Sequence, residues 1–428
     1  MSTADPHGSS IWHVDRTERV RELVSGDPGM ERALVLVREN GRNCGAVTIE
    51  GTGAPESDPA VAAVPAAPRR GWNEGAGATV PATVVICTTG RSDLLTASVK
   101  AVLAQDHRDY RVVVVDNAPT TGLARTALKG IDDERLTVVN ASRPGLSRAR
   151  NRGVLAATGE VVAFTDDDAI VDPHWLTALI DPFTASPLVG ATTGIVLPLE
   201  LVHAPQRWFE SRGGFPKDFT PRVWAKGKVP DSVRGLGEAG DGGPLYPVAT
   251  ARVGAGVCMA LRRDVLMEVG PFDPSLGAGT PTRGGEDLDM FARVLAHGDV
   301  IVHTPDALVH HRHRVDHEGL DAQVRGNGSG MSALLVKAVL ARPSTALTLA
   351  SRAPAVAARL RPGSARVAGT DDDVPSGLTR SEVKGFLEGP VRYLRSRHAN
   401  RLRPRKRPSS GRADGAEGAP KGPADGRD

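Results

Sequence analysis

The sequence predicts an α/β fold, a doubly wound αβα sandwich around a mostly parallel central sheet. Short apolar runs alternate with helical patterns between residues 83 and 183. The runs are apolar at consecutive positions, which is typical of strands that are buried on both faces. Two of the runs end in carboxylates, and ligands bind at the carboxyl ends of the strands in such sheets. Right-handed crossovers between parallel strands then place helices on both faces of the sheet.

The elements of this predicted sandwich follow one another in a regular order. Each apolar run of about five residues is read as a buried strand, and each longer periodic segment is read as a helix. The strands are predicted at 83–87, 111–116, 136–140, 161–165, 257–261 and 300–303, and the helices at 92–105, 147–157, 175–183 and 286–297. Residues 200–250 hold many Gly and Pro and are expected to form loops with short helices.

The N-terminal part predicts a small unit, residues 1–50. Residues 1–30 are polar and are read as irregular. Two short apolar runs flank Asn40-Gly41, which is a strong turn signal, so residues 31–50 are expected to form a β-hairpin. Residues 51–80 are rich in Gly, Ala and Pro and are read as a linker.

The main domain is expected to cover residues 81–330, and the C-terminal part divides into two. Residues 331–400 are predicted to be helical, and 401–428 are predicted to be a disordered tail, because Pro, Gly and charge dominate them. A basic run extends from Arg392 to Arg407. Such a run can attract anionic lipid head groups, and a solvated tail is the alternative.

Composition excludes several classes of protein. A net charge of +3 with 4% aromatic residues does not favour nucleic-acid binding. The cysteines Cys44, Cys87 and Cys258 are too scattered for a zinc site or a disulfide framework. The first residues lack a signal-peptide pattern, and no apolar run is long enough to span a bilayer. We therefore expect a cytoplasmic protein, either free or peripheral at the inner face of the membrane.

Carboxylates close two of the predicted strands. Asp116 ends one strand, and Asp166, Asp167 and Asp168 follow another. Clustered oxygen ligands suit a hard divalent cation, Mn²⁺ or Mg²⁺, and such a cation commonly holds phosphates. A nucleotide diphosphate is the natural partner. The letters Thr-Asp-Asp-Asp recur at 370–373 without an apolar strand before them, so that copy is given no catalytic role.

Three further groups of residues could take part in binding or catalysis, and each also has a structural explanation. In Gly285-Glu286-Asp287 the acids occupy the first turn of a predicted helix, where they also complement the helix dipole. Histidines cluster at 310–313 after an apolar run and could bind a metal or phosphate, or lie on the surface. The segment 143–151 brings arginines to a helix start, which favours phosphate, with a solvated basic face as the alternative.

Taken together, these blocks resemble the family 2 glycosyltransferases of the GT-A fold. The resemblance covers about residues 83–314. It rests on five blocks in the expected order, Val84-Val85-Ile86-Cys87-Thr88, Val114-Val115-Asp116-Asn117, Gly145 through Asn151, Phe164 through Asp168 and Gly285-Glu286-Asp287. The fold implied is GT-A-like, and the activity implied is sugar transfer from a nucleotide-sugar donor to an acceptor hydroxyl.

The resemblance also implies roles for individual residues. Asp287 would be the general base, and Glu286 beside it would place the acceptor. Asp168 and His311 would bind the metal, with inversion as the outcome of a single displacement. Contacts to the nucleotide sugar would come from Thr88, Arg91, Asp116, Arg150, Asp166 and Asp167. Cys87-Thr88-Thr89-Gly90-Arg91 departs from the usual first block, and Asn117 stands where a second Asp is common.

The partners implied are a UDP-, GDP- or TDP-sugar and an unidentified acceptor, either lipid-linked or a cell-envelope glycan precursor. Trp208, Phe209 and Phe215 could line an acceptor site or simply pack in the core. A nucleotidyltransferase is a rival, but the segment after the first strand lacks a Gly-rich loop with a Lys. A sugar-nucleotide-binding scaffold without activity is another. A dinucleotide-binding dehydrogenase is set aside because no G-x-G-x-x-G follows the first strand.

Overall fold

A mixed sheet of ten strands forms the centre of the molecule in the computed structural model, which describes residues 7–51, 53–359 and 374–402. Its strand order is β12-β11-β14-β10-β13-β8-β5-β6-β7, with β9 paired to β14. The strands are β5 (Ala82–Thr88), β6 (Tyr110–Asp116), β7 (Leu136–Asn140), β8 (Val161–Asp166), β9 (Ala169–Val171), β10 (Val189–Pro198), β11 (Arg222–Trp224), β12 (Glu238–Ala239), β13 (Met259–Arg262) and β14 (Val300–His311).

The predicted αβα sandwich is confirmed. Strands β7, β6, β5 and β8 are parallel, and so are β10 and β14, while β13 runs antiparallel between the two groups. Every residue of β10 is buried, as expected for a strand covered on both faces. The carboxyl ends of β5, β6, β8 and β14 therefore face one edge of the sheet, where the predicted site residues follow.

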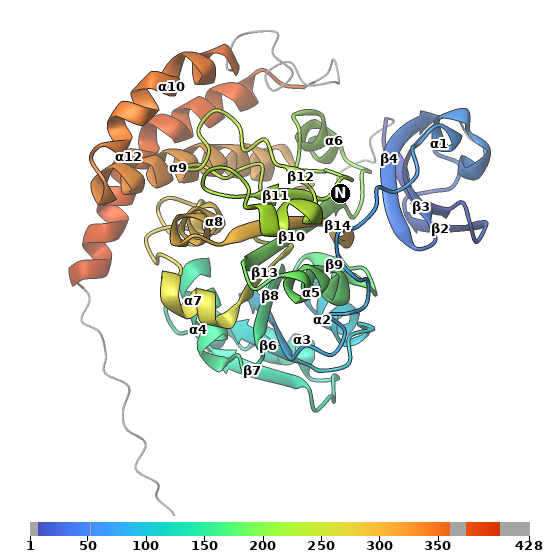
Figure 1. Cartoon of the computed structure of the whole chain (residues 1–428), viewed down its shortest axis with the longest axis horizontal. Coiled ribbons are helices and arrows are strands. Elements are labelled where there is room, and N and C mark those ends of the chain that lie inside the picture. The colour runs from blue at the N-terminus through green and yellow to red at the C-terminus, as the bar shows by residue number, and fades with distance from the viewer. Residues whose placement is uncertain (1–6, 52, 360–373, 403–428) are drawn as a thin grey trace, which may run out of the picture.

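Helices cover both faces of the sheet (Figure 1). One hydrophobic core joins the sheet to α2 (Leu95–Leu103), α3 (Leu123–Leu128) and α5 (Trp175–Ala185). The other joins it to α4 (Leu146–Ala156), α7 (Arg263–Val269) and α8 (Glu286–His297). The apolar side chains of β5, β6, β8 and β13 alternate between these two cores, which fixes the register of these strands.

Two predictions within the main domain needed correction. The strand predicted at 300–303 continues to His311 as β14, because β10 pairs with it again from Leu308 to His311 after an irregularity at residues 304–307. Residues 200–250 are more regular than expected. They form α6 (Ala204–Ser211), β11, a 3-10 helix η3 (Asp231–Leu236) and β12, and β11 extends the sheet beside β14.

The N-terminal unit is a sheet of four strands, with order β2-β1-β3-β4. The predicted hairpin is present as β3 (Arg32–Glu39) and β4 (Arg42–Glu50). The reading of residues 1–30 as irregular was wrong for β1 (Ser9–Asp15) and β2 (Val20–Ser25). Strand β1 pairs with its neighbour β2 and is parallel to β3, and the mixed polar and apolar residues of β1 and β2 give no strand signal.

The predicted linker packs against both units. It contains η1 (Pro55–Ser57) and α1 (Pro59–Ala62), and Val61, Val64 and Trp72 are buried. Arg70 lies buried between the units, where its guanidinium forms an ion pair of 2.5 Å with Asp306 on β14. Two more contacts join the N-terminal sheet to the main domain: Arg38 with Asp172 at 2.5 Å and His13 with His310 at 2.9 Å.

Three helices close the described chain: α9 (His317–Ala341), α10 (Thr345–Arg359) and α12 (Gly377–Leu402). They lie on the opposite side of the molecule from the N-terminal sheet (Figure 1). The helical segment begins before the predicted residue 331, because Asp316 caps α9 by accepting a hydrogen bond from the backbone of Gly319. The predicted disordered tail, apart from residues 401 and 402, and the repeat at 370–373 lie outside the described residues. Within the described part, no helix is long and apolar enough to cross a bilayer.

Candidate active site

The first group of the site forms where β8 ends. Asp166 is the last residue of β8, and a turn through Asp167 and Asp168 leads into β9. Strand β9 runs antiparallel to the end of β14, with Ala169 opposite His311. This pairing brings Nε2 of His311 to 3.2 Å from Oδ1 of Asp168. One ligand atom from each of Asp166, Asp168 and His311 lies within 4.8 Å of the others, so the three can hold one metal ion.

The charges within this group depend on one another. Burial disfavours the imidazolium of His311, but the carboxylates of Asp168 and Asp166 outweigh it and raise its pKa. Burial also opposes ionisation of Asp168, and the charge and hydrogen bond of His311 more than offset this and lower its pKa. Burial raises the pKa of Asp166 despite the nearby charge of Arg150. A carboxylate–imidazole set of this kind suits Mn²⁺ or a similar divalent cation.

Asp167 points to a different neighbour. Its Oδ2 accepts a hydrogen bond of 2.5 Å from the hydroxyl of Thr88, the last residue of β5. Its backbone oxygen accepts one from the hydroxyl of Ser92 at 2.8 Å. Burial raises the pKa of Asp167 to about 6, although the Thr88 bond opposes this. Thr88 and Asp167 therefore brace the turn that presents Asp166 and Asp168.

Arg150 connects the two acidic groups from inside the protein. Its side chain is buried, with Nη1 at 2.9 Å from Oε1 of Glu286 and Nη2 at 3.7 Å from Oδ1 of Asp166. Nη2 also donates to the backbone oxygen of Gly256 at 3.2 Å. A solvated basic face, the alternative considered for this helix, does not hold for Arg150. Burial and the charge of Asp287 raise the pKa of Glu286 to about 7, against the charge of Arg150.

Asp287 lies at the start of α8, next to this buried pair. Gly285 caps the helix with φ of 89°, a conformation that favours glycine, and the next two residues are the predicted acids. Oδ2 of Asp287 accepts from the backbone N–H of Gly256 at 2.9 Å, and Oδ1 accepts from that of Leu288 at 2.8 Å. These bonds hold the carboxylate in place, and each oxygen keeps capacity for a further hydrogen bond.

The remaining predicted contacts lie at the neighbouring strand ends. Asp116 ends β6 and is buried, and its Oδ1 accepts from the backbone N–H of Ala118 at 2.9 Å. The side chain of Asn117 binds the backbone of Ala141, Arg143 and Gly145 rather than pointing outwards. Arg91 is exposed in the loop after β5. The structure thus places all the predicted residues along one sheet edge and the adjoining start of α8, with Arg150 and Glu286 beneath it.

The sequence reasoning grouped His313 with the other histidines but missed its partner, Glu210. His313 lies beyond His311, and its Nε2 is 2.7 Å from Oε1 of Glu210 on α6. Burial opposes ionisation of Glu210, but Lys217 and His313 outweigh it and hold its pKa at about 2. Phe215 packs edge-on against His311, with ring centroids 5.3 Å apart. The aromatic segment therefore covers the histidines, and the alternation His311-x-His313 was the signal that could have located this group.

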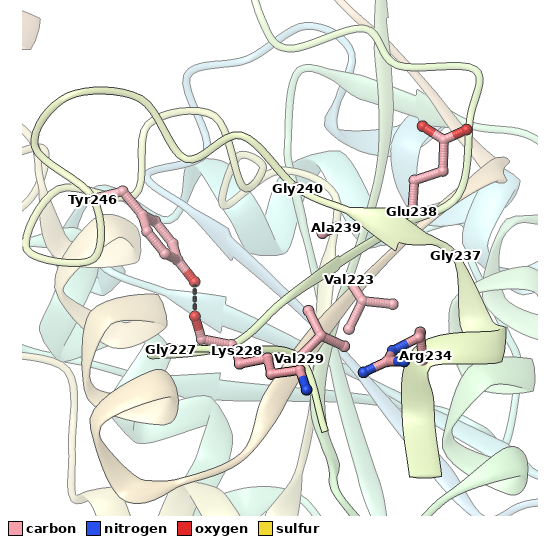
Figure 2. Close-up of a pocket in the computed structure, with 11 residues that line it drawn as sticks. Val223, Gly227, Lys228, Val229, Arg234, Gly237, Glu238, Ala239, Gly240 and Tyr246 are labelled. Atoms are coloured by element: carbon pink, nitrogen blue, oxygen red, sulfur yellow. Dashed lines mark hydrogen bonds between the residues drawn. The ribbon is translucent and has the colours of Figure 1, made fainter. Parts of the chain in front are cut away.

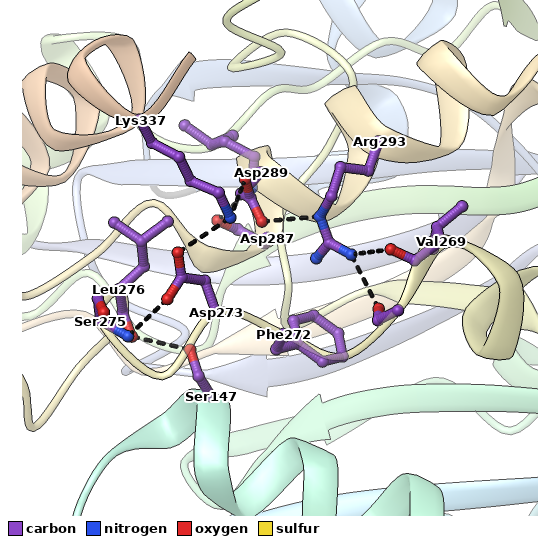
Figure 3. Close-up of polar contacts among 12 residues, drawn as sticks. Ser147, Val269, Phe272, Asp273, Ser275, Leu276, Asp287, Asp289, Arg293 and Lys337 are labelled. Carbon is purple, nitrogen blue, oxygen red and sulfur yellow. Dashed lines mark hydrogen bonds and ion pairs between the residues drawn. The ribbon is translucent and has the colours of Figure 1, made fainter. Parts of the chain in front are cut away.

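The C-terminal helices brace the base of α8 (Figure 3). Nζ of Lys337 on α9 lies 2.7 Å from Asp289 and 3.0 Å from Asp273. Arg293 pairs with the other oxygen of Asp289 at 2.9 Å and donates to the backbone at Val269 and Gly270. Asp289 is two residues after Asp287. Lys337, which lies outside the main domain, therefore helps to fix the first turn of α8.

A separate pocket of about 480 Å³ lies among β11, β12 and the loop that reaches Tyr246 (Figure 2). Its lining includes Lys228, Arg234 and Glu238, and the hydroxyl of Tyr246 donates to the backbone oxygen of Ala225. None of the acids of the candidate site lines it. We place the site at the acids because ligand-binding chemistry gathers there, at the carboxyl ends of the strands.

Residues 83–229 match the model of the family described as glycosyl transferase family 2. The chain carries a family 2 glycosyltransferase domain. The matched segment contains the turn with Asp166 and Asp168, and it ends before α8.

Curated glycosyltransferases share sequence with the same part of the chain. It is 28% identical over 235 residues to the glucosyl-dolichyl phosphate glucuronosyltransferase of Haloferax volcanii, an alignment that covers 54% of this chain and 68% of that protein. It is 30% identical over 236 residues to the succinoglycan biosynthesis protein ExoM of Rhizobium meliloti, covering 53% and 64%. Both alignments are about as long as the main domain.

Among solved structures, the mannosyltransferase of Pyrobaculum calidifontis in complex with GDP-Man and Mn²⁺ superposes with a TM-score of 0.47. The two chains are 20% identical, and the superposition covers 74% of this chain and 90% of that one.

Proposed function

We propose that this family 2 glycosyltransferase binds a nucleotide-diphosphate sugar and a divalent cation at Asp166, Asp168 and His311, and transfers the sugar to an acceptor hydroxyl. The observation that carries the proposal is that these three residues come together beside Glu286 and Asp287. A divalent cation bound there would neutralise the charge that develops on the departing diphosphate.

In this proposal, Asp287 accepts the proton of the acceptor hydroxyl as the hydroxyl attacks the sugar. A carboxylate fixed by two backbone hydrogen bonds is well suited to a positioned general base. Attack from the side opposite the diphosphate inverts the anomeric centre. Arg150 forms ion pairs with both Glu286 and Asp166 and so holds the two carboxylates in place. It therefore acts as a positioning residue beneath the acceptor and donor sides.

Nucleotide contacts are proposed at the other strand ends, through Thr88, Arg91, Asp116 and Asp167. Arg150, predicted as a donor contact, has its guanidinium committed to protein groups, so we favour the positioning role.

For the acceptor we propose a lipid-linked saccharide or a cell-envelope glycan precursor. The first class appears in the name of the Haloferax relative. Radiolabelled sugar should then move from the donor into solvent-extractable lipid or into polymeric glycan.

The donor site is tested by calorimetric titration with UDP, GDP and TDP, with and without Mn²⁺. We expect one nucleotide to bind more tightly when Mn²⁺ is present. In Asp168→Asn, Mn²⁺ should no longer increase the affinity for that nucleotide. Asp373→Asn, at the same letter of the second Thr-Asp-Asp-Asp sequence, is the matched control and should bind like the unaltered protein. If the folded protein binds no nucleotide under any metal condition, the proposal fails and a scaffold role gains support.

The general base is tested separately. Asp287→Asn should reduce kcat by about 10²- to 10⁴-fold while nucleotide affinity stays within about twofold. Asp264 is a matched control, because it lies in the first turn of α7, is exposed and accepts a hydrogen bond from the next backbone N–H, as Asp287 does. Asp264→Asn should leave kcat unchanged. Equal kcat in the two variants would exclude Asp287 as the base.

A further inference from the structure

The two long C-terminal helices contact each other through small residues. Gly385, Gly389 and Ser396 of α12 are buried against α9. A Cβ atom at Gly385 would lie 2.0 Å from the backbone oxygen of Arg325, and one at Gly389 would lie 1.9 Å from the hydroxyl of Ser332. The two backbones therefore approach too closely for larger side chains. Leu378 and Tyr393 are buried, but the other large apolar residues of α12 lie on sides of the helix that do not contact α9.

Most of them lie on the opposite side of α12, which we call its outer face. Its apolar members are spaced by four, four, three and eight residues, so they share one side of the helix. Their exposed fractions are high for apolar side chains, and they are Val383 40%, Leu387 72%, Val391 52%, Leu394 50% and Leu402 69%. The apolar surface of α12 is therefore turned outwards, which is the reverse of an ordinary helix in a water-soluble bundle.

The same outer face is basic. Arg380, Lys384, Arg395 and Arg401 fall within the same helical sector and are exposed. The acids of α12 are Glu382 and Glu388. Glu382 lies towards the body of the protein and pairs with Arg212, whereas Glu388 lies at the border of the outer face and pairs with Arg325 and Arg392. Positive charge and exposed leucine thus occur together on the outer face, and the carboxylate that borders it is paired with arginines.

We infer that the outer face of α12 docks on a lipid bilayer that contains anionic head groups. The leucine and valine side chains would enter the boundary between head groups and acyl chains, and the flanking basic residues would bind the head groups. The chain continues with Arg403, Arg405, Lys406 and Arg407, which adds charge of the same sign. Figure 1 shows α12 among the helices at the side of the molecule that lies opposite the N-terminal sheet.

A second copy of the chain is a poorer occupant of this face. In a two-fold dimer each outer face would meet itself, which would bring basic residues against basic residues. An anionic bilayer instead presents charge of the opposite sign to all four basic side chains. The inference does not rest on the donor site, so the two can fail independently.

Flotation of the full-length protein with vesicles tests the inference. We expect binding to vesicles of phosphatidylcholine with about a third phosphatidylglycerol, and weak binding to pure phosphatidylcholine. Binding should weaken as salt rises from low ionic strength to physiological strength, because the Debye length shortens to about 8 Å. The double variant Lys384→Glu/Arg395→Glu should lose about fivefold in partitioning for each basic charge removed.

The apolar part is tested with Leu387→Asp/Leu394→Asp, which changes only exposed positions. This variant should lose at least about tenfold in partitioning while it keeps its nucleotide affinity. Leu155→Asp is the matched control, since Leu155 on α4 is 73% exposed and lies outside the face. Unchanged flotation of the double variant, or equal binding to neutral vesicles, would overturn the inference. So would a dimer in solution that the double variant dissociates.

Discussion

Glu286→Gln should make the protein more stable at neutral and alkaline pH while impairing it as an enzyme. The buried carboxyl of Glu286 has its pKa raised from 4.5 to about 7 by burial and by Asp287. The folded state therefore holds a proton that the unfolded chain releases between these two pH values, so stability falls as pH rises through this window. This difference in pKa corresponds to about 3 kcal/mol of stability, which is lost as pH rises above 7.

Glutamine resembles the protonated form and has no proton to lose. We expect Glu286→Gln to be more stable than the unaltered protein by about 3 kcal/mol at pH 8 and by about 1 kcal/mol at pH 5. Urea denaturation at the two pH values measures both numbers. Sugar transfer should fall at the same time, because the ion pair of 2.9 Å with Arg150 is lost. A variant that is less stable than the unaltered protein at pH 8 would refute the reasoning.

Glu210 provides the control of opposite sign. Lys217 and His313 outweigh burial and hold its pKa at about 2, so it contributes stability above pH 4.5 that is lost as pH falls towards 2. Glu210→Gln should cost about 3 kcal/mol at pH 7, since the pKa of Glu210 is lowered from 4.5 to about 2. The same substitution at the buried Glu286 and at the half-buried Glu210 should therefore change stability in opposite directions. If both variants are destabilised, loss of packing rather than ionisation explains them.

Two further substitutions test the parts that surround the site. Lys337→Met leaves two carboxylates of the α8 network without their shared cation and should cost about 3 kcal/mol in urea denaturation. It should lower kcat more than nucleotide affinity, and equal losses in both would contradict a bracing role for α9. Arg70→Met removes the buried ion pair between the N-terminal sheet and β14 and should cost about 3–5 kcal/mol. The exposed pair of Arg21 is the comparison, and Arg21→Met should cost less than about 1 kcal/mol; a similar cost for both would show that the Arg70 pair does not anchor the sheet.

The sequence located the central strands and most of the candidate site because their signals are local. Continuous apolar runs mark β5, β6 and β8, and the carboxylates at their ends reach one edge once the sheet is parallel. It did not locate β1, whose partner β3 lies far along the chain and whose pattern mixes polar and apolar residues. It also began α9 late, because Gly326, Gly328 and Gly330 have low helix propensity although close packing requires small residues there.

Within the site, the sequence could not indicate which charges are buried. Arg150 and Arg148 look equivalent on one predicted helix, yet Arg150 reaches Glu286 on α8, which is 136 residues away. Only the packing of α4 on β5 and β6 decides which arginine enters the core. The same holds for Glu210, whose partner His313 comes from the far end of β14 and is brought there by the sheet.

The measurement that tests the central claim most directly is anomalous diffraction from crystals grown with Mn²⁺ and the nucleotide diphosphate that binds in calorimetry. The account predicts a manganese peak within coordination distance, about 2.0–2.3 Å, of Asp168 and His311, with the diphosphate on its other side. A bound nucleotide whose manganese lies away from both residues, or a peak that persists in Asp168→Asn, would contradict it.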